Sequence, residues 1–471
     1  MTQTADSVRR RPASWPPELA FVRTDRTGLV TEASESLTTL LKTPHSSLIG
    51  HSFADWSVTT WPAAIDTQVF QAVRDGESYA GYLPLRRPDG ADVWTFAIVT
   101  PVANGLLFVH TPPADPAALD EVRALFDHLA KAEERARNAG DQSAEAKEQG
   151  AKAAQEFWAT SIWSTYPEFM APAMVAQARA VKPAPPVQGG AAPGEDPVIG
   201  LATAIGALDA QVRPRLERAD TLNRLAETLR ETSWGGAEVM GTLGRIAAAA
   251  MVGSAEVGDA APALVSTAKA AATLGAGTLT RVQALLADVT EARGAVGRLE
   301  ARLATVAVHG ALVRAAADAA WPPADPGPGT VPAACAVELA RVLVSGIDEL
   351  ISNLASTRDI LARVREGADA AAEDVARFHG FINSWRLQVP RWHITERIEA
   401  HLGVMDGRQR LAAEHVAQLR ELAGTCQEGI EYCAAAGLFG PMNAIGHLAT
   451  ATRGPKGRHA VATPPDLGAL A

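Results

Sequence analysis

Residues 282–313 of this 471-residue chain read VQALLADVTEARGAVGRLEARLATVAVHGALV, and their pattern indicates the fold class. Counting from Val282 in alternating steps of three and four residues reaches only apolar side chains or glycine. A second run of this kind begins at Ala340 and ends at Trp385, and only Thr357 breaks it. A repeat of 3.5 residues keeps one stripe of a helix facing a partner helix, so both runs are typical of coiled coils. Short amphipathic helices in a globular bundle are the alternative.

The two runs are separated by WPPADPGPGTVP, residues 321–332. A helix cannot continue through this segment, because proline lacks the amide hydrogen and clashes with the preceding turn. We therefore expect a long antiparallel coiled-coil hairpin over 198–437, with its tip near 320–332. One pair of helices with a single seam buries little surface, so we expect a parallel homodimer of hairpins, or a higher oligomer, that forms a four-helix bundle.

Composition divides the rest of the chain into segments. The Pro/Gly-rich segment KPAPPVQGGAAPGEDP can neither hold a helix nor bury a core, so it is a linker. The expected segments are a disordered N-terminus (1–17), a mixed domain of strands and helices (18–112), a helical connector (113–181), the linker (182–197) and, after the hairpin, a disordered tail (438–471). The predicted fold class is α+β.

Charge and composition exclude several classes of protein. The formal net charge is -10, which argues against nucleic-acid binding, because that requires a basic surface. Three cysteines are too few for a disulfide framework. The longest apolar run, residues 246–253, is too short to span a bilayer, so we expect no membrane insertion and a cytoplasmic location.

The motifs of common enzyme classes are missing from the sequence. It contains no GxxxxGKS/T phosphate loop, no HExxH and no GxSxG. His393, His401, His415 and His447 are not spaced like metal ligands. We therefore expect no catalytic residues, no enzymatic activity and no metal site.

Four stretches in the N-terminal domain carry a family resemblance. They are DRTGLVTEAS (25–34), LIGHSF (48–53), GESYAG (76–81) and RRPDGADVW (86–94). Together they resemble a PAS domain of the kind found in bacterial aerotaxis receptors. The resemblance implies an antiparallel five-stranded sheet flanked by helices, around a central pocket that holds a flavin, a haem, another small molecule or nothing. Pro88-Asp89-Gly90 independently predicts a hairpin between two strands.

Aromatic residues are the candidates for lining that pocket: Trp56, Trp61, Tyr79 and Trp94. They could stack on the ring system of FAD, or simply fill the core of the domain. Flavin-type aerotaxis receptors carry His-Pro-x-Met-Pro after LIG and a tryptophan at the place of Tyr79, and this chain departs from both. A haem needs an axial imidazole, but nothing singles out one of His45, His51 and His110. FAD, haem and no cofactor stay open as alternatives.

The segments VAVHGALVRAAA (306–317) and VPAACAVELARVL (331–343) resemble a degenerate version of the signalling tip of methyl-accepting chemotaxis proteins. In that family the tip docks the chemotaxis histidine kinase and its coupling protein. The resemblance implies partner contacts at the matching positions, which are Val308, His309, Val313, Leu339 and Arg341. His309, Val313 and Leu339 stand where the family has polar side chains.

A PAS domain followed by helices and a heptad hairpin is the layout of soluble aerotaxis-like transducers. We therefore expect a cytosolic sensory signal transducer of the chemoreceptor type, in which PAS sensing is coupled to a coiled-coil signalling hairpin. The alternative is a scaffold protein that senses nothing and uses PAS dimerisation and a coiled-coil arm to organise an assembly.

Overall fold

A computed structural model describes most of the chain, and its described residues belong to two compact units. The first unit comprises Met1–Glu217, Glu300–Ile351 and Ala436–Ala471, and the second comprises Arg218–Leu299 and Ser352–Ala435. Two long helices, α9 and α10, contribute to both units. The described residues are 20–56, 62, 65, 73, 78–102, 104–138, 143–160, 166–180, 197–257, 261–319, 333–393, 395–435 and 437–451.

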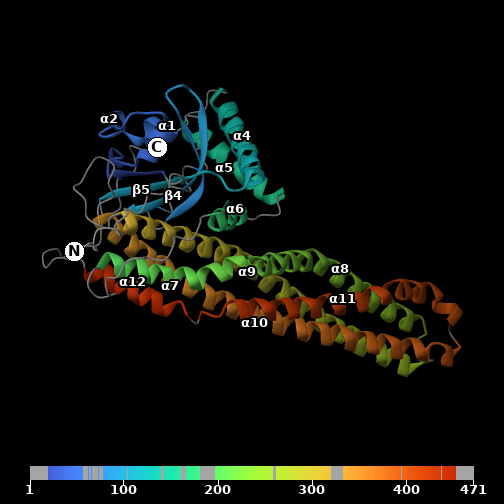
Figure 1. Ribbon diagram of the computed structural model, residues 1–471. Coiled ribbons are helices and arrows are strands. Elements are labelled where there is room, and N and C mark those ends of the chain that lie inside the picture. The colour runs from blue at the N-terminus through green and yellow to red at the C-terminus, as the bar shows by residue number, and fades with distance from the viewer. Residues whose placement is uncertain are drawn as a thin grey trace. The chain divides into compact units, whose positions relative to one another are not determined.

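The first unit contains an antiparallel sheet of five strands (Figure 1). Its strands are β1 (Ala20–Asp25), β2 (Val30–Ala33), β3 (Tyr79–Arg86), β4 (Asp92–Val102) and β5 (Gly105–Thr111), in the spatial order β2-β1-β5-β4-β3. Three short helices follow β2: α1 (Glu35–Leu41), α2 (His45–Leu48) and the 3-10 helix η1 (Phe53–Trp56). An antiparallel five-stranded sheet with helices is what the PAS resemblance implies, so the predicted α+β fold is confirmed.

Local chemistry sets the ends of these elements. Asp25 accepts hydrogen bonds from the amides of Thr27 and Leu29, and Gly28 adopts φ 84°, which closes the turn between β1 and β2. Ser34 caps α1 by accepting a hydrogen bond from the Leu37 amide. Gly90 at φ 82° completes the expected turn between β3 and β4.

The register of the sheet assigns its side chains to two faces. Trp94, Phe96, Ile98 and Thr100 alternate with Thr95, Ala97 and Val99 along β4, so the two sets point to opposite sides. On the side of Val99, Phe53 of η1 packs 4.8 Å from the ring of Phe108, and we call this the inner face. On the side of Trp94, Phe126 of α4 packs 5.4 Å from the tryptophan ring, and we call this the outer face.

Three helices follow the sheet: α4 (Pro116–Asn138), α5 (Ser143–Thr160) and α6 (Tyr166–Ala180). Asp115 caps α4 by accepting hydrogen bonds from two amides of its first turn. The amide group of Gln177 on α6 donates to the Thr111 hydroxyl at 2.6 Å and accepts from the Ala114 amide at 2.9 Å. These bonds fix α6 to the end of the last strand.

The helical half of the first unit consists of α7 (Pro197–Glu217), α12 (Phe439–Ala451) and parts of α9 (Pro262–Ala319) and α10 (Ala333–Gln388). Arg302 on α9 pairs with Glu349 on α10 at 2.6 Å. Arg314 on α9 donates to the Ala202 carbonyl of α7 at 3.1 Å, and Arg341 on α10 donates to the Ala449 carbonyl of α12 at 3.0 Å. In this unit each limb of the predicted hairpin thus contacts a further helix.

Helix α12 corrects one sequence prediction. We expected a disordered tail over 438–471, but Phe439–Ala451 is helical and buries Ile445 and Ala449. A proline within a helix normally disrupts it. Pro441 instead lies in the first turn of the helix, where a missing amide hydrogen is tolerated.

The second unit is an antiparallel four-helix bundle of α8 (Ala219–Val257), α11 (Glu399–Tyr432) and the remaining parts of α9 and α10. Arg281 of α9 pairs with Asp374 of α10 at 2.7 Å. Further along α9, Glu291 pairs with Arg363 of α10 at 2.5 Å. Residue numbers increase along α9 from the first ion pair to the second, while those of the partners on α10 decrease. The two helices are therefore antiparallel, as predicted. The short helices η3 (Pro390–Trp392) and η4 (Thr395–Ile398) connect α10 to α11.

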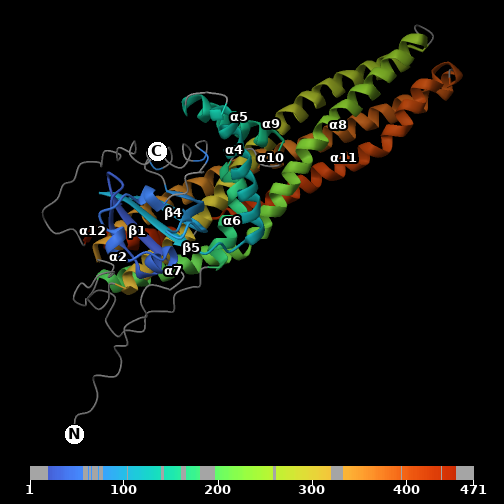
Figure 2. The same ribbon diagram turned by 90° about the horizontal axis from the view of Figure 1, so that it is seen from above.

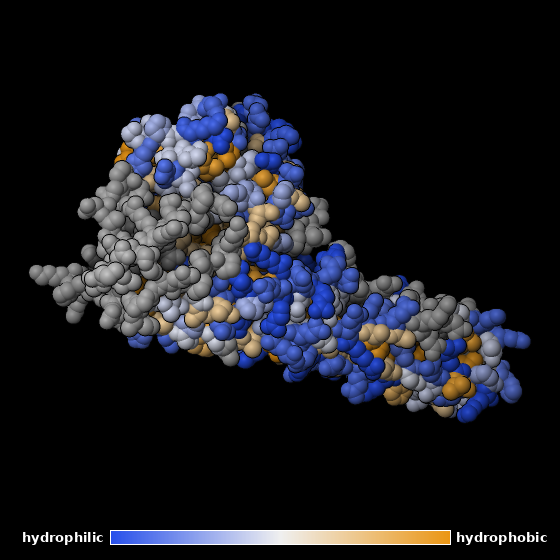
Figure 3. All heavy atoms as spheres, viewed as in Figure 1, coloured by the Kyte–Doolittle hydropathy of each residue, from blue (hydrophilic) through white to orange (hydrophobic). Residues whose placement is uncertain are grey.

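Helices α8 and α11 occupy the places that we expected a second chain to fill. The indole of Trp385 on α10 donates to the Ser254 hydroxyl on α8 at 2.8 Å. Arg365 on α10 donates to the Gln427 side chain on α11 at 2.7 Å. Figure 3 shows mostly hydrophilic side chains on the described surface of this bundle in that view. The four-helix bundle therefore forms within one chain. The apolar stripes of α9 and α10 are covered by α8 and α11, so they are no longer a reason to expect a homodimer.

Candidate functional site

The central strand of the sheet, β5, carries a buried histidine on the inner face. His110 on β5 is 0% exposed, and its Nδ1 atom lies 2.9 Å from the Thr95 hydroxyl. Its ring is 5.9 Å from the ring of Phe53 and parallel to that of Phe108. The Nε2 atom is buried and has no hydrogen-bond partner. Burial lowers the pKa of His110 from 6.5 to about 3, so the imidazole is neutral at pH 7.

The predicted cofactor-lining residues do not form one pocket. Trp94 is on the outer face, where it packs against Phe126 and the Arg123 guanidinium. Tyr79 pairs with Val99 on the inner face, and its hydroxyl lies 2.9 Å from that of Tyr166. Trp56 is buried in η1, and Trp61 lies outside the described residues. The register of β3 and β4, which the sequence does not reveal, separates Tyr79 from Trp94.

On the outer face, the sheet makes polar contacts with the helical half of the same unit. The Thr100 hydroxyl on β4 lies 2.8 Å from Nε2 of His309 on α9. Arg23 on β1 donates to the Glu338 carboxylate on α10 at 2.9 Å. Figure 1 shows β4 and β5 alongside this part of α9. The five-stranded sheet therefore contacts α9 and α10, the two limbs of the predicted hairpin, directly.

His309 is buried and neutral in this contact. Its side chain is 3% exposed. Burial, together with the positive charge of Arg302, lowers its pKa from 6.5 to about 4. A neutral imidazole has one donor and one acceptor nitrogen, so it can form the hydrogen bond to Thr100 in either direction.

The other predicted tip residues also face the interior of this unit. Val308, Val313 and Leu339 are buried, and Arg341 is bonded to the Ala449 carbonyl of α12. The expectation that these five positions bind a partner stays a prediction. In this structure, side chains of the same chain surround them.

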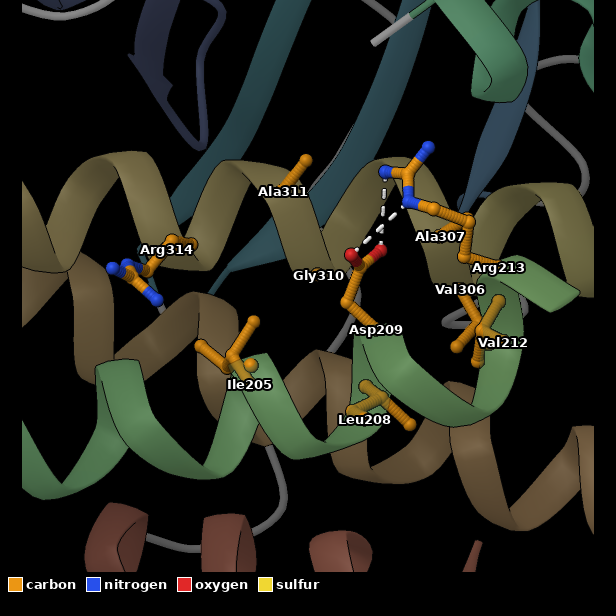
Figure 4. A pocket seen from close by; sticks show the side chains of 11 residues that line it. Ile205, Leu208, Asp209, Val212, Arg213, Val306, Ala307, Gly310, Ala311 and Arg314 are labelled. Atoms are coloured by element: carbon orange, nitrogen blue, oxygen red, sulfur yellow. Dashed lines mark hydrogen bonds and ion pairs between the residues drawn. The ribbon is translucent and has the colours of Figure 1, made fainter. Parts of the chain in front are cut away.

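A groove lies between α7 and α9 in the same unit (Figure 4). Gly206 of α7 and Gly310 of α9, which have no side chains, line it. Asp209 and Arg213, an ion pair at 3.1 Å on α7, line one end, and Arg314 of α9 lines the other. The side of α9 that carries Gly310 therefore has room for a methyl group beside α7.

Gly310→Ala tests whether this room exists in solution. A β-carbon at position 310 would lie 3.8 Å from the nearest atom of Leu208 and 3.9 Å from Ile205, which is ordinary contact. Alanine also costs less than glycine within a helix, so we expect the variant to gain about 0.5–1 kcal/mol of unfolding free energy in urea denaturation. A loss of stability would mean that the groove is closed in solution.

A buried carboxyl group lies where the connector meets the helices. Glu300 on α9 is 6% exposed, and its Oε1 atom has no hydrogen-bond partner. Burial raises its pKa from 4.5 to about 7, although the positive charge of Arg179 on α6 opposes the shift. Arg179 also donates twice to the Leu216 carbonyl at the end of α7. This cluster links α6, α7 and α9.

A membrane-spanning helix and a cluster of metal ligands are both absent from the part of the chain that the structure describes. No helix in that part has a stretch apolar and long enough to cross a membrane. In the same residues, no group of three or more His, Cys, Asp or Glu side chains could hold a metal ion.

Comparisons with known proteins find similarity only among solved structures. No family model matches the chain, and no curated protein matches it. One similar structure is the PAS domain of a protein from Colwellia psychrerythraea, at 21% identity and TM-score 0.19, covering 20% of this chain and 85% of that one. Another is the light state of the blue-light photoreceptor Aureochrome1 LOV, at 22% identity and TM-score 0.18, covering 20% and 77%.

A third similar structure is the blue-light activated histidine kinase EL346 of Erythrobacter litoralis. It is 11% identical with a TM-score of 0.21, and the match covers 41% of this chain and 59% of the kinase. The match thus spans less than two thirds of the kinase. The PAS resemblance of this chain rests on its own sequence motifs and on its antiparallel five-stranded sheet.

Proposed function

We propose that this protein is a sensory signal transducer whose PAS domain passes its state to the helices through the outer face of its sheet. The observation that carries the proposal is the buried Thr100–His309 contact. Strand β4 supplies residues to both faces, so a change at Thr95 on the inner face can displace Thr100 on the outer face. A ligand shifts such an arrangement only if it binds one of two packings more tightly than the other.

His110 is the residue that would hold a ligand on the inner face. Its orphaned Nε2 atom fits a ligand that offers one hydrogen bond, and it would also fit the iron of a haem. A flavin would bring redox or light sensitivity, and a haem would bring gas binding. The Thr95 hydroxyl, the parallel ring of Phe108 and the tilted ring of Phe53 hold the imidazole in place for either ligand.

A ligand test follows from the geometry of His110. Wild-type protein should copurify with a small molecule, detected by its absorption spectrum and by mass spectrometry after denaturation. Replacing His110 with leucine removes one buried polar contact, worth about 1–3 kcal/mol, so we expect the affinity for the ligand to fall by about 5- to 150-fold and the ligand content of the purified protein to fall with it. His51→Leu, at an exposed position, is the matched control. Full occupancy in the His110 variant would contradict this role.

The finer proposal is a non-enzymatic, cytosolic transducer of the chemoreceptor type that acts on a chemotaxis kinase through its coupling protein. The antiparallel pairing of α9 and α10 and the resemblance of the segments at 306–317 and 331–343 support it. Pull-down with purified coupling protein tests it. Absence of both a ligand and coupling-protein binding would favour the scaffold alternative.

A further inference from the structure

Helix α9 has a second buried face in the first unit. In the second unit, the buried positions of α9 recur every three or four residues and form a narrow stripe, such as Val282, Leu285 and Val289. From Leu303 to Ala317, burial instead extends around most of the helix. We define the second face as Thr305, His309, Leu312 and Ala316, which share one side of the helix by their spacing of four, three and four.

The PAS sheet lies against this second face. His309, within the face, contacts Thr100 of β4. At its edge on α10, Glu338 receives the hydrogen bond from Arg23 of β1, and both side chains of this pair are less than 20% exposed. Leu312 and Ala316 are apolar, so water exposure of the second face would be unfavourable unless another surface replaced the sheet.

We propose that the second face is the partner-binding surface of the transducer and that the PAS sheet is its reversible intramolecular cover. This inference rests on the proposed function and specifies the surface that gives the output. A partner that takes the place of the sheet must present an apolar centre, a basic side chain for Glu338 and a hydrogen-bonding group for His309. A protein surface carrying an arginine or lysine beside apolar residues meets these needs. Two of the sequence-predicted tip residues, His309 and its neighbour Val308, lie at this surface or next to it.

Acylation of histidine by diethyl pyrocarbonate tests the cover in the full-length chain. In wild type, His309 and His110 should react slowly and exposed His51 quickly. Arg23→Glu places a third carboxylate beside those of Glu338 on α10 and Glu32 on β2, both of which pair with Arg23 in the wild type, so we expect the labelling rate of His309 to rise at least tenfold. The charge swap Arg23→Glu with Glu338→Arg restores an opposite pair and should restore slow labelling.

His110 is the internal control for folding, because it becomes reactive only if the PAS domain itself opens. If His110 becomes reactive in Arg23→Glu, the milder variant Arg23→Gln is used in its place. The expected increase in the labelling rate of His309 is then smaller. Equal labelling of His309 in wild type and variant, or wild-type labelling as fast as that of His51, would overturn the cover.

Binding of purified coupling protein distinguishes the cover from the function on which it rests. We expect Arg23→Glu to bind it at least tenfold more tightly than wild type, and the charge swap to bind like wild type. Fast labelling of His309 without coupling-protein binding would support the cover and overturn the chemotaxis-type function. Tighter binding with His309 still protected would overturn the assignment of the second face.

Discussion

Replacing Glu300 with glutamine is expected to stabilise the protein by about 3 kcal/mol at pH 8 and by less than about 1 kcal/mol at pH 5. The pKa of Glu300 is raised from 4.5 to about 7 because the carboxyl group is buried. The folded state therefore binds the proton more tightly than the unfolded state. The stability due to this proton is fully present below pH 4.5 and is lost as the pH rises through about 7. Glutamine cannot ionise, so the variant avoids that loss.

Urea denaturation of both proteins at pH 5, 6.5 and 8 measures this difference. The matched control is Glu421→Gln on α11, an exposed position where we expect changes within about 0.5 kcal/mol at every pH. A Glu300→Gln effect that is the same at pH 5 and pH 8 would show that the carboxyl group is hydrated in solution.

Acidification should destabilise the wild type more than the His309→Gln variant, by about 2 kcal/mol between pH 7 and pH 5. Burial and Arg302 lower the pKa of His309 from 6.5 to about 4, so the folded state resists protonation. The stability from the neutral imidazole is present above pH 6.5 and is lost as the pH falls through about 4. Glutamine has no proton to gain and can still form a hydrogen bond to Thr100.

The comparison must be made between variants, because other groups titrate in the same range. His110 adds acid sensitivity of its own, and Glu300 acts in the opposite direction. The measurement is the free energy of unfolding in urea at pH 7 and pH 5, with His51→Gln as the exposed control. Identical acid sensitivity in His309→Gln and wild type would mean that His309 is not buried in solution.

The sequence was sufficient to predict the main elements of the fold. The 3.5-residue repeats identified α9 and α10, and the ion pair between Arg302 and Glu349 shows these limbs side by side. The PAS resemblance implied the five-stranded sheet, and the turn residues Pro88-Asp89-Gly90 predicted the hairpin of β3 and β4. The sequence could not show that α8 and α11 complete the bundle within one chain, because a heptad stripe specifies an apolar neighbour but not which helix supplies it.

The candidate site was less accessible to sequence reasoning. The inner and outer faces depend on strand register, so Tyr79 and Trp94 could not be separated before their pairing was known. The sequence did not distinguish His110 from His45 and His51 as a ligand-binding residue. Its complete burial in the structure does. One available indication was overlooked. The stretch TVAVHGALVRAAA, residues 305–317, is apolar on every side of a helix, and such a helix is normally covered all round.

The most direct test of direct contact between the PAS sheet and α9 is a double-mutant cycle on Thr100 and His309. Unfolding free energies are measured for wild type, Thr100→Val, His309→Leu and the double variant, with Thr95→Val and His110→Leu as a positive-control cycle within the domain. A buried hydrogen bond predicts a coupling of about 1–3 kcal/mol for Thr100 and His309. A coupling near zero, with a normal value for Thr95 and His110, would contradict the contact through which we propose that the PAS domain signals.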